Sequence, residues 1–401
     1  MTVQNNTLER GREIDLEIDS VAFGGAGIGR YGTMVVFVPF TVEGDSVSVE
    51  IAVVKKRFAT GNLKSVHIAS PFRTVPRCAA YMRCGACSYQ HIAYDHQLVL
   101  KNRQVRDALE RIGRFQNIPL EDTLPSPQAY SYRGKADFHA ERGRERNRVI
   151  GFTARATNDI IDLERCEIVH ESINTFLLQE RRKGSRLGRF ALWSAPQEEG
   201  SDARIVRRVA GQEMLVPHHG FFQANLFLTE KLVQVVEAFC GLSGTETVID
   251  GYCGSGLFSL FLAPSCGYLY GIEAEGEAVR CAEENMRRAG IRSATFYAGD
   301  IGNVLRDRFI RKSIPVDVIL VDPPRTGMEP ETLSALNALH PTKIVYVSCN
   351  PTTLARDLRL LADFGYALRK VSPLDMFPQT SHIETVVLLE HDAPFPSTHP
   401  H

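Results

Sequence analysis

Apolar strand-like segments alternate with helical segments in the second half of the chain, and this alternation restricts the possible folds more than any other feature. Beyond Val216 we expect helices at 225–240, from about 256 and at 276–289, with strands at 247–250 and 268–273 and three more that end at Asp300, Asp322 and Ser348. Such alternation is typical of a parallel, doubly wound sheet. The sequence therefore predicts a Rossmann-like α/β domain over residues 216–391, with ligands at the carboxyl ends of its strands.

The first 69 residues have a different pattern, with short alternating β segments between residues 13 and 68. The glycine-rich turn Phe23–Arg30 resembles a Gly-x-Gly-x-x-Gly motif, but no helical pattern follows it. A dinucleotide-binding loop needs that helix, so we reject this reading. A five-stranded barrel of the oligonucleotide-binding (OB) type fits better.

Between these two parts, residues 70–215 begin with a cysteine-rich loop and a helix at 94–114, then return to short strands with many arginines. We interpret this stretch as a second, β-rich domain, whose helix could pack on the α/β domain of residues 216–391. Residues 392–401 are rich in Pro and His and are expected to form a frayed tail.

Composition places the chain among ordinary globular proteins, since 44% of its residues are hydrophobic and 23% are charged. No signal-peptide pattern and no apolar stretch of about 18 residues is present. We expect a cytoplasmic monomer without a membrane partner. The net charge is −1, yet residues 101–190 hold 18 Arg or Lys against 13 Asp or Glu. This excess is either a solvated face or a footprint for phosphates.

The segment Asp250-Gly-Tyr-Cys-Gly-Ser-Gly256 follows a strand and opens a helix, so its glycines permit close approach of a ligand. Glu273 ends the next strand, where a carboxylate can bind both hydroxyls of a ribose. An NAD site has the same spacing. Asp300 and Asp322 end two further strands. Carboxylates at these positions do not require a ligand with a diphosphate, which favours S-adenosylmethionine over NAD.

Cys349 in Ser348-Cys-Asn-Pro351 follows an apolar run and is expected at the carboxyl end of a strand. A free cysteine is most often a buried packing residue. Here, however, Glu384 of His382-Ile-Glu384 supplies a candidate base, so the pair suggests covalent catalysis on a ring carbon.

Three more cysteines are closely spaced at Cys78, Cys84 and Cys87, with a distant fourth at Cys166. Four thiolates suit zinc or an iron-sulfur cluster, and the spacing does not separate the two. The third interpretation is that these four cysteines are unrelated free thiols. Cys240, Cys253, Cys266 and Cys281 are interpreted as packing residues.

Five motifs in order, over nearly the whole chain, resemble those of the S-adenosylmethionine-dependent RNA uracil-5-methyltransferases. They are Phe222-Gln-Ala-Asn225, Asp250–Gly256, Asp322-Pro-Pro-Arg325, Ser348–Asp357 and Phe377–Glu384. The resemblance implies that Cys349 is the nucleophile, that Glu384 is the base, and that the cofactor is bound by Gln223, Tyr252, Leu257, Glu273, Asp300 and Asp322. Two residues depart from the family pattern, because Leu257 replaces a residue that is often polar and Gly251 one that is usually apolar.

The resemblance further implies an RNA-binding barrel of the TRAM type and, in the ribosomal-RNA branch of the family, a [4Fe-4S] cluster on Cys78, Cys84, Cys87 and Cys166. Candidate RNA contacts mix basic and aromatic residues, as suits unpaired RNA. They comprise Lys55–Phe58, Tyr130, Tyr132, Arg133, Lys135, Phe138, Arg142, Arg144, Arg146, Arg148, Phe221 and Phe222.

The sequence therefore predicts methylation of C5 of a loop uridine, flipped out of its stack, in 23S ribosomal RNA. The same reaction on transfer RNA remains an alternative. So does a catalytically silent iron-sulfur protein that binds RNA during assembly, although the intact Cys349 and Glu384 argue against it.

Overall fold

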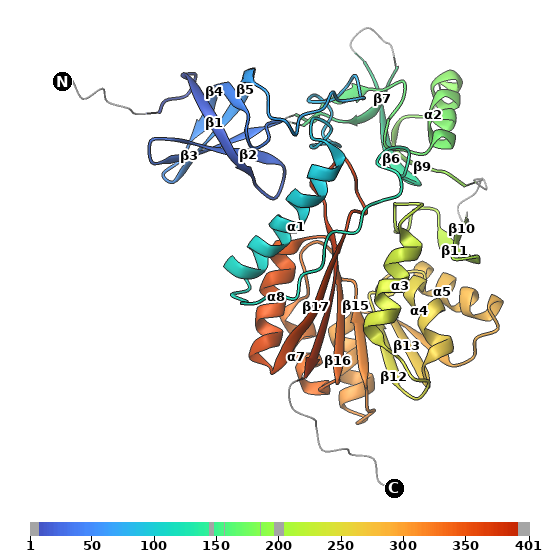
Figure 1. Ribbon diagram of the computed structural model, residues 1–401. Coiled ribbons are helices and arrows are strands. Elements are labelled where there is room, and N and C mark those ends of the chain that lie inside the picture. The colour runs from blue at the N-terminus through green and yellow to red at the C-terminus, as the bar shows by residue number, and fades with distance from the viewer. Residues whose placement is uncertain (1–7, 144–147, 156, 185, 196–203, 392–401) are drawn as a thin grey trace.

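A closed five-stranded barrel forms the N-terminal part of the computed structural model, which describes residues 8–143, 148–155, 157–184, 186–195 and 204–391 (Figure 1). Its strands are β1 (Glu13–Val21), β2 (Ala26–Tyr31), β3 (Met34–Pro39), β4 (Ser46–Val54) and β5 (Phe58–Ile68). Alternate residues of β1, among them Ile14, Leu16 and Ile18, point into the barrel core. The predicted OB-like barrel is confirmed.

The central part is built on a four-stranded antiparallel sheet in the order β8-β7-β6-β9. These strands are β6 (Lys135–Arg142), β7 (Arg148–Thr153), β8 (Ile160–Asp162) and β9 (Gly188–Trp193). Helix α2 (Glu171–Lys183) packs on the sheet through Ile173 and Leu177. Sequence reasoning missed α2, because only three of its residues are buried and its last turns are polar.

Two elements attach this part to the larger domain. Helix α1 (Tyr94–Arg111) inserts Val105 and Leu109 into a core cluster of the catalytic domain. The hairpin of β10 (Arg204–Val209) and β11 (Gln212–Pro217) packs against α5 (Gly276–Arg288), although most of it precedes residue 216. Asn285 of α5 fixes the hairpin, because it accepts a hydrogen bond from the amide of Leu215 and donates one to its carbonyl.

The C-terminal part contains a seven-stranded sheet in the order β14-β13-β12-β15-β16-β18-β17. Five strands run parallel: β12 (Thr247–Gly251), β13 (Tyr268–Glu273), β14 (Ala294–Ala298), β15 (Val318–Val321) and β16 (Lys343–Ser348). The pair β17 (Tyr366–Leu374) and β18 (Glu384–His391) adds an antiparallel edge. The predicted doubly wound sheet is confirmed, whereas this edge was not predicted.

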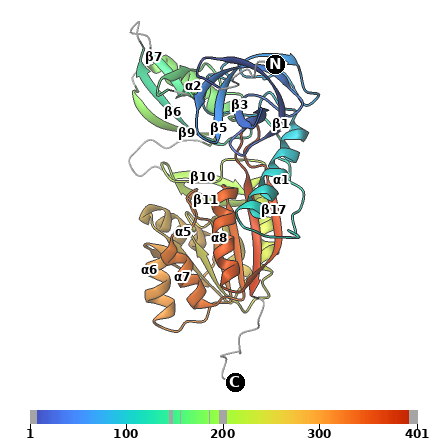
Figure 2. The same ribbon diagram turned by 90° about the vertical axis from the view of Figure 1, so that its left-hand side faces the viewer.

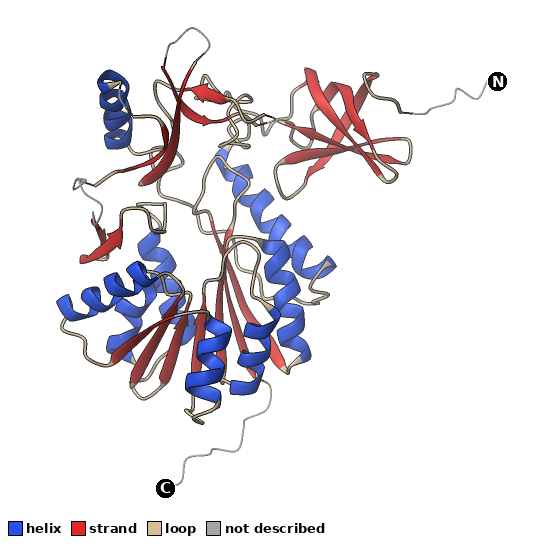
Figure 3. Cartoon of the chain, turned by 180° about the vertical axis from the view of Figure 1, so that it is seen from behind, coloured by secondary structure: helices blue, strands red, loops and turns tan. Residues whose placement is uncertain are grey.

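Helices cover both faces of the sheet, as Figures 2 and 3 show. One face packs against α3 (Thr229–Cys240), α4 (Leu257–Leu262) and α5, with a short 3₁₀ turn, η1 (Ala263–Ser265), after α4. The other packs against α1, α7 (Pro330–Leu339), α8 (Pro351–Asp363) and α6 (Ile301–Val304), which continues into a π-helical turn, η2 (Leu305–Ile310). The strands are therefore apolar on both sides, which explains their unbroken hydrophobic runs.

The strand order reverses between β12 and β15, so the carboxyl ends of these two strands flank the topological switch point of the sheet. Open α/β sheets bind their ligands in the crevice at such a point. Among the helices that the structure describes, none has the length and apolar character needed to cross a membrane.

Candidate active site

Cys349 lies in a tight turn between β16 and α8. Asn350 caps α8, because its side chain accepts a hydrogen bond from the amide of Thr352 at 3.0 Å. The hydroxyl of Ser348 accepts one from the amide of Asn350 at 3.2 Å. The thiol is partly exposed, in contrast to Cys240, Cys253, Cys266 and Cys281, which are buried. The turn thus holds Cys349 at the carboxyl edge of the sheet, as predicted from its sequence position.

Glu384 is the first residue of β18, which pairs antiparallel with β16. The register joins Ser348 to Thr385, so Cys349 and Glu384 lie at the same end of this strand pair. Glu384 is almost completely buried, with 3% of its surface exposed. The unpredicted antiparallel edge is therefore the element that brings the candidate base to the candidate nucleophile.

Two carboxyl groups, one thiol and one guanidinium form an electrostatically linked group at this edge. Burial, with the nearby Glu384 and Asp322 carboxylates, raises the pKa of Cys349 to about 11, and Arg325 opposes the shift. Burial and Asp322 raise the pKa of Glu384 well above its ordinary value. Burial and Asp250 raise the pKa of Asp322 to about 7. Of these groups, Asp322 is the one with a pKa near neutral pH.

Arg325 was quoted in the sequence motif but given no role. In the structure its guanidinium affects both Cys349 and Glu384. Its Nη2 lies 3.2 Å from Nε2 of His382, whose pKa is lowered to about 4 by burial and by Arg325. His382 is therefore a neutral acceptor for Arg325 at neutral pH. Its place in the sequence could have indicated a role in the site, because Arg325 ends the Asp-Pro-Pro-Arg run that begins at Asp322.

The loop between β12 and α4 contains three residues with left-handed backbone: Tyr252, Gly254 and Gly256. The amide of Gly254 donates to Oε2 of Glu273 at 3.0 Å, and the amide of Glu275 donates to Oε1 at 2.9 Å. Glu273 is thereby fixed beside the loop, at the end of β13. A Cβ atom at Gly251 would lie 2.4 Å from Ile301 Cδ1, the end of a flexible side chain, so a larger residue there requires that side chain to shift.

Three buried polar atoms near this loop lack a hydrogen-bond partner among the described residues: Oδ1 of Asp250, Oγ of Ser255 and Oε1 of Gln223. Asp250 accepts a hydrogen bond from Ser259 at 2.5 Å through its other oxygen, and burial raises its pKa to about 7. Gln223 Nε2 donates to Asp322 Oδ2 at 3.5 Å. Unsatisfied buried polar atoms favour a polar ligand here. Asp250 and Ser255 were not among the predicted site residues.

Two further residues, Asp300 and Leu257, were predicted to bind the cofactor. Asp300 lies at the end of β14 and caps α6, because its Oδ1 accepts a hydrogen bond from the amide of Asn303 at 3.0 Å. Leu257 begins α4 and is buried in the core cluster beneath the loop. A direct contact of either side chain with the cofactor stays a prediction.

Cys78, Cys84, Cys87 and Cys166 line one small pocket of the central part. Burial raises the pKa values of Cys84, Cys87 and Cys166. The backbone around the pocket is held by side-chain amides: Gln90 accepts from the amide of Cys78, and Asn174 binds both backbone groups of Cys166. Within the described ranges, no three His, Cys, Asp or Glu side chains form a metal-binding group.

Several predicted RNA contacts are wrong. Tyr132 and Phe138 are fully buried, and Phe222 is nearly so, because all three pack in hydrophobic clusters. Lys55–Phe58, Arg142 and Phe221 are exposed. Alternation along β6 explains the error at Phe138, since every second residue of that strand points into the core. Arg144 and Arg146 lie outside the described residues.

Comparison with known proteins agrees with this geometry. The profile of tRNA (uracil-5-)-methyltransferases matches residues 204–392, and that of the TRAM domain matches residues 7–64. An uncharacterized RNA methyltransferase of Halalkalibacterium halodurans is 30% identical over 97% of this chain and 99% of its own length. One of Bacillus cereus is 31% identical over 95% of this chain and 97% of its own length.

Among solved structures, the chain is similar to Pyrococcus abyssi tRNA (uracil-54, C5)-methyltransferase in complex with S-adenosyl-L-homocysteine. The TM-score is 0.70 and the identity 25%, over 93% of this chain and all of that one. The N-terminal barrel is thus a TRAM domain, and the resemblance seen in the motifs is confirmed. The chain belongs to the S-adenosylmethionine-dependent RNA (uracil-5-)-methyltransferases.

Proposed function

We propose that the protein methylates C5 of a uridine in 23S ribosomal RNA through a covalent adduct between Cys349 and C6 of the base. The observation that carries the mechanism is the pairing of β16 with β18, which puts a thiol and a buried carboxyl group at one end of two neighbouring strands. A uracil ring between them would present C6 to the thiol and C5 to the carboxylate.

The reaction needs both groups, because C5 of uracil is too weak a nucleophile by itself. The Cys349 thiol loses its proton to solvent, and the thiolate adds to C6, which shifts the C5–C6 double-bond electrons toward O4 as an enolate. S-adenosylmethionine, when bound, supplies the methyl group that C5 takes. Glu384 then removes the C5 proton, the double bond re-forms, and the C6–sulfur bond breaks to release the thiolate.

The residues fit S-adenosylmethionine by the chemistry of their donors. Glu273 could accept the ribose hydroxyls, Asp300 the adenine amine, and the unsatisfied atoms of Gln223 and Asp250 further polar groups. Tyr252 and Asp322 border the same edge of the sheet, at the ends of β12 and β15. The backbone of the glycine loop, at the N-terminus of α4, permits close approach to the ligand.

Transfer RNA is the second candidate substrate. It is favoured by the matching family profile and by the Pyrococcus enzyme, both named for tRNA. Ribosomal RNA is favoured by the four cysteines around one pocket, since the resemblance associates such a set with the ribosomal branch. In either RNA the target base must leave its stack to reach Cys349, so a loop uridine is the expected site.

The substrate is tested with unmodified transcripts of 23S ribosomal RNA and of transfer RNAs, each incubated with the protein and methyl-labelled S-adenosylmethionine. We expect label in 5-methyluridine of the 23S transcript and background label in the transfer RNAs. The reverse result would establish the second candidate. No label in either RNA, with S-adenosylmethionine bound, would contradict the proposed activity.

We further propose that Cys78, Cys84, Cys87 and Cys166 hold a [4Fe-4S] cluster with a structural role, since methyl transfer moves no net electrons. The proposal is supported by the four cysteines that line one pocket, as the resemblance implies. In the described residues no three of these side chains form a metal-binding group, so they would have to draw closer together to hold the cluster. An anaerobic preparation should contain roughly four irons per chain and absorb near 400 nm. Cys166→Ser should lose both signals, and Cys281→Ala, at a buried cysteine of the catalytic domain, should keep them. One zinc per chain, without sulfide, would contradict the cluster.

The activity should rise with pH across the neutral and alkaline range. Asp322, with a pKa raised to about 7, loses its proton as the pH rises through that value, and Glu384, whose pKa is raised in the same direction, needs a higher pH than an ordinary carboxyl group to lose its own. Cys349, with a pKa of about 11, yields about tenfold more thiolate for each pH unit below that value. We expect kcat/KM to increase from pH 6 to pH 10 in a methyl-transfer assay. A maximum at or below pH 6 would contradict these assignments.

A further inference from the structure

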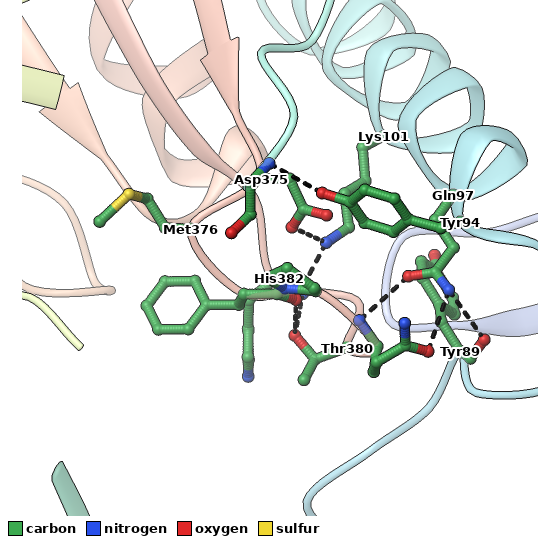
Figure 4. A network of polar contacts seen from close by, with 12 residues as sticks. Tyr89, Tyr94, Gln97, Lys101, Asp375, Met376, Thr380 and His382 are labelled. Carbon is green, nitrogen blue, oxygen red and sulfur yellow. Dashed lines mark hydrogen bonds and ion pairs between the residues drawn. The ribbon is translucent and has the colours of Figure 1, made fainter. Parts of the chain in front are cut away.

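The loop that precedes Glu384 is held from outside the catalytic domain. This segment, Asp375–Ile383, joins β17 to β18 and is called the base loop below. Figure 4 shows that residues of α1 and of the cysteine-rich segment meet it. Glu384 follows this segment directly and is the first residue of β18, where it pairs with Leu374 of β17 at the other end of the base loop.

Gln379 is the point where most of these contacts converge. Its amide donates to Oε1 of Gln97 at 3.0 Å, and its side-chain oxygen accepts from Nε2 of Gln97 at 3.1 Å. Its carbonyl accepts from the amides of Ser88 and Tyr89, at 3.1 and 3.0 Å. Gln379 has left-handed backbone, with φ of 67°. A non-glycine residue keeps this conformation only where its surroundings fix it.

Lys101, one turn further along α1, makes a second contact with the base loop. Its Nζ lies 2.5 Å from Oδ1 of Asp375 and donates to the carbonyl of Phe377 at 3.1 Å. The side chains of Lys101 and Asp375 are completely buried. A buried ion pair adds little net stability compared with apolar residues, but it can specify one geometry.

The central part contributes a third contact, since the hydroxyl of Tyr132 donates to the carbonyl of Pro378 at 3.0 Å. Ser88 and Tyr89 directly follow Cys87, one of the four cysteines of the proposed cluster. Residues 88–101 and Tyr132, all distant in sequence from the base loop, therefore bind the backbone of this single nine-residue segment.

We propose that Gln97 and Lys101 of α1, together with the amides of Ser88 and Tyr89, position Glu384 by fixing the base loop, so that the cysteine-rich segment is part of the frame of the catalytic base. These are positioning residues, because none of them reaches the reacting atoms. The proposal rests on the function proposed above. It explains why a cysteine site in a separate part of the chain could matter for methyl transfer without taking part in it.

The test uses Gln97→Met, which removes both contacts with Gln379 without leaving a buried charge. Gln104→Met is the matched control, since Gln104 is a buried glutamine of the same helix that bonds Tyr89 and the carbonyls of Val21 and Ala22, not the base loop. Displacement of a catalytic group by about 1 Å can cost 10²-fold in rate. We expect kcat to fall by at least about tenfold in Gln97→Met, with KM for S-adenosylmethionine unchanged.

A structural defect would slow every step, so the decisive readout is which step slows. With ordinary substrate RNA, Gln97→Met should accumulate the covalent Cys349 adduct and show an enlarged isotope effect for deuterium at C5. Gln104→Met should show neither. If Gln97→Met slows formation and resolution of the adduct equally, or behaves like Gln104→Met, the positioning role is wrong. Glu384→Gln serves as the reference variant. If Glu384→Gln fails to accumulate the adduct, the proposed mechanism itself is wrong, and not only the positioning role.

Discussion

Replacing Cys349 by alanine should reduce methyl transfer by roughly 10⁴- to 10⁶-fold, since removal of a catalytic nucleophile has costs of this order. Without the thiolate, C6 of the uracil receives no electron pair, and C5 is not activated toward the sulfonium. The substitution should leave binding of S-adenosylmethionine and RNA almost unchanged, because the thiol is partly exposed and its hydrogen-bond partner Arg325 keeps a second contact with His382. The rate is measured as label incorporated into 5-methyluridine.

Cys253→Ala is a suitable control, because Cys253 is a buried cysteine within the cofactor loop. Its thiol packs in a hydrophobic core cluster and donates a weak hydrogen bond to the carbonyl of Gly254 at 3.8 Å. We expect this variant to keep most of its activity. Substantial methylation by Cys349→Ala would exclude the covalent route, and equal losses in both variants would indicate a general requirement for packing at this edge.

The second large effect is expected for Glu384→Gln, which should lower kcat by roughly 10²- to 10⁴-fold, the usual contribution of a general base. The amide cannot take the C5 proton, but Cys349 can still add to C6. Methylated RNA should therefore remain attached to the protein, visible as a covalent complex in a denaturing gel.

Glu390→Gln makes the same change on the same strand, where Glu390 is partly exposed and pairs with Arg369. Surface pairs of this kind contribute little, so turnover and adduct levels should match those of the unchanged protein. Loss of adduct in Glu384→Gln, with cofactor binding intact, would show that the carboxyl group acts before the thiol addition.

The sequence predicted those parts of the fold that depend on local pattern. Continuous apolar runs ending in Asp250, Glu273, Asp300 and Asp322 indicated parallel strands buried on both faces, and they form β12 to β15 with only small shifts in their ends. Strict alternation between Glu13 and Val21 indicated a strand with one face in a barrel core. The spacing of apolar residues was enough to predict these strands, because that spacing reflects which faces of each strand are buried in its sheet.

The sequence did not predict features that depend on contacts between distant segments. The direction of β18 is set by the strands beside it, since β18 pairs antiparallel with both β16 and β17. The local pattern of residues 366–391 does not distinguish antiparallel strands from parallel ones. Tyr132 was read as an RNA contact because its neighbours are basic, whereas it bonds the base loop from the central core. Gln97 and Lys101 gave no signal, since polar residues on a helix are usually exposed.

The central claim, a covalent bond between Cys349 and C6 of the target uridine, is tested most directly with substrate RNA that carries 5-fluorouridine. Fluorine at C5 cannot be removed as a proton, so the methylated adduct cannot break down. We predict a complex that survives denaturation, forms only with S-adenosylmethionine, and maps by mass spectrometry to the peptide containing Cys349. The absence of a complex with an RNA that the protein methylates, or attachment at another residue, would contradict the claim.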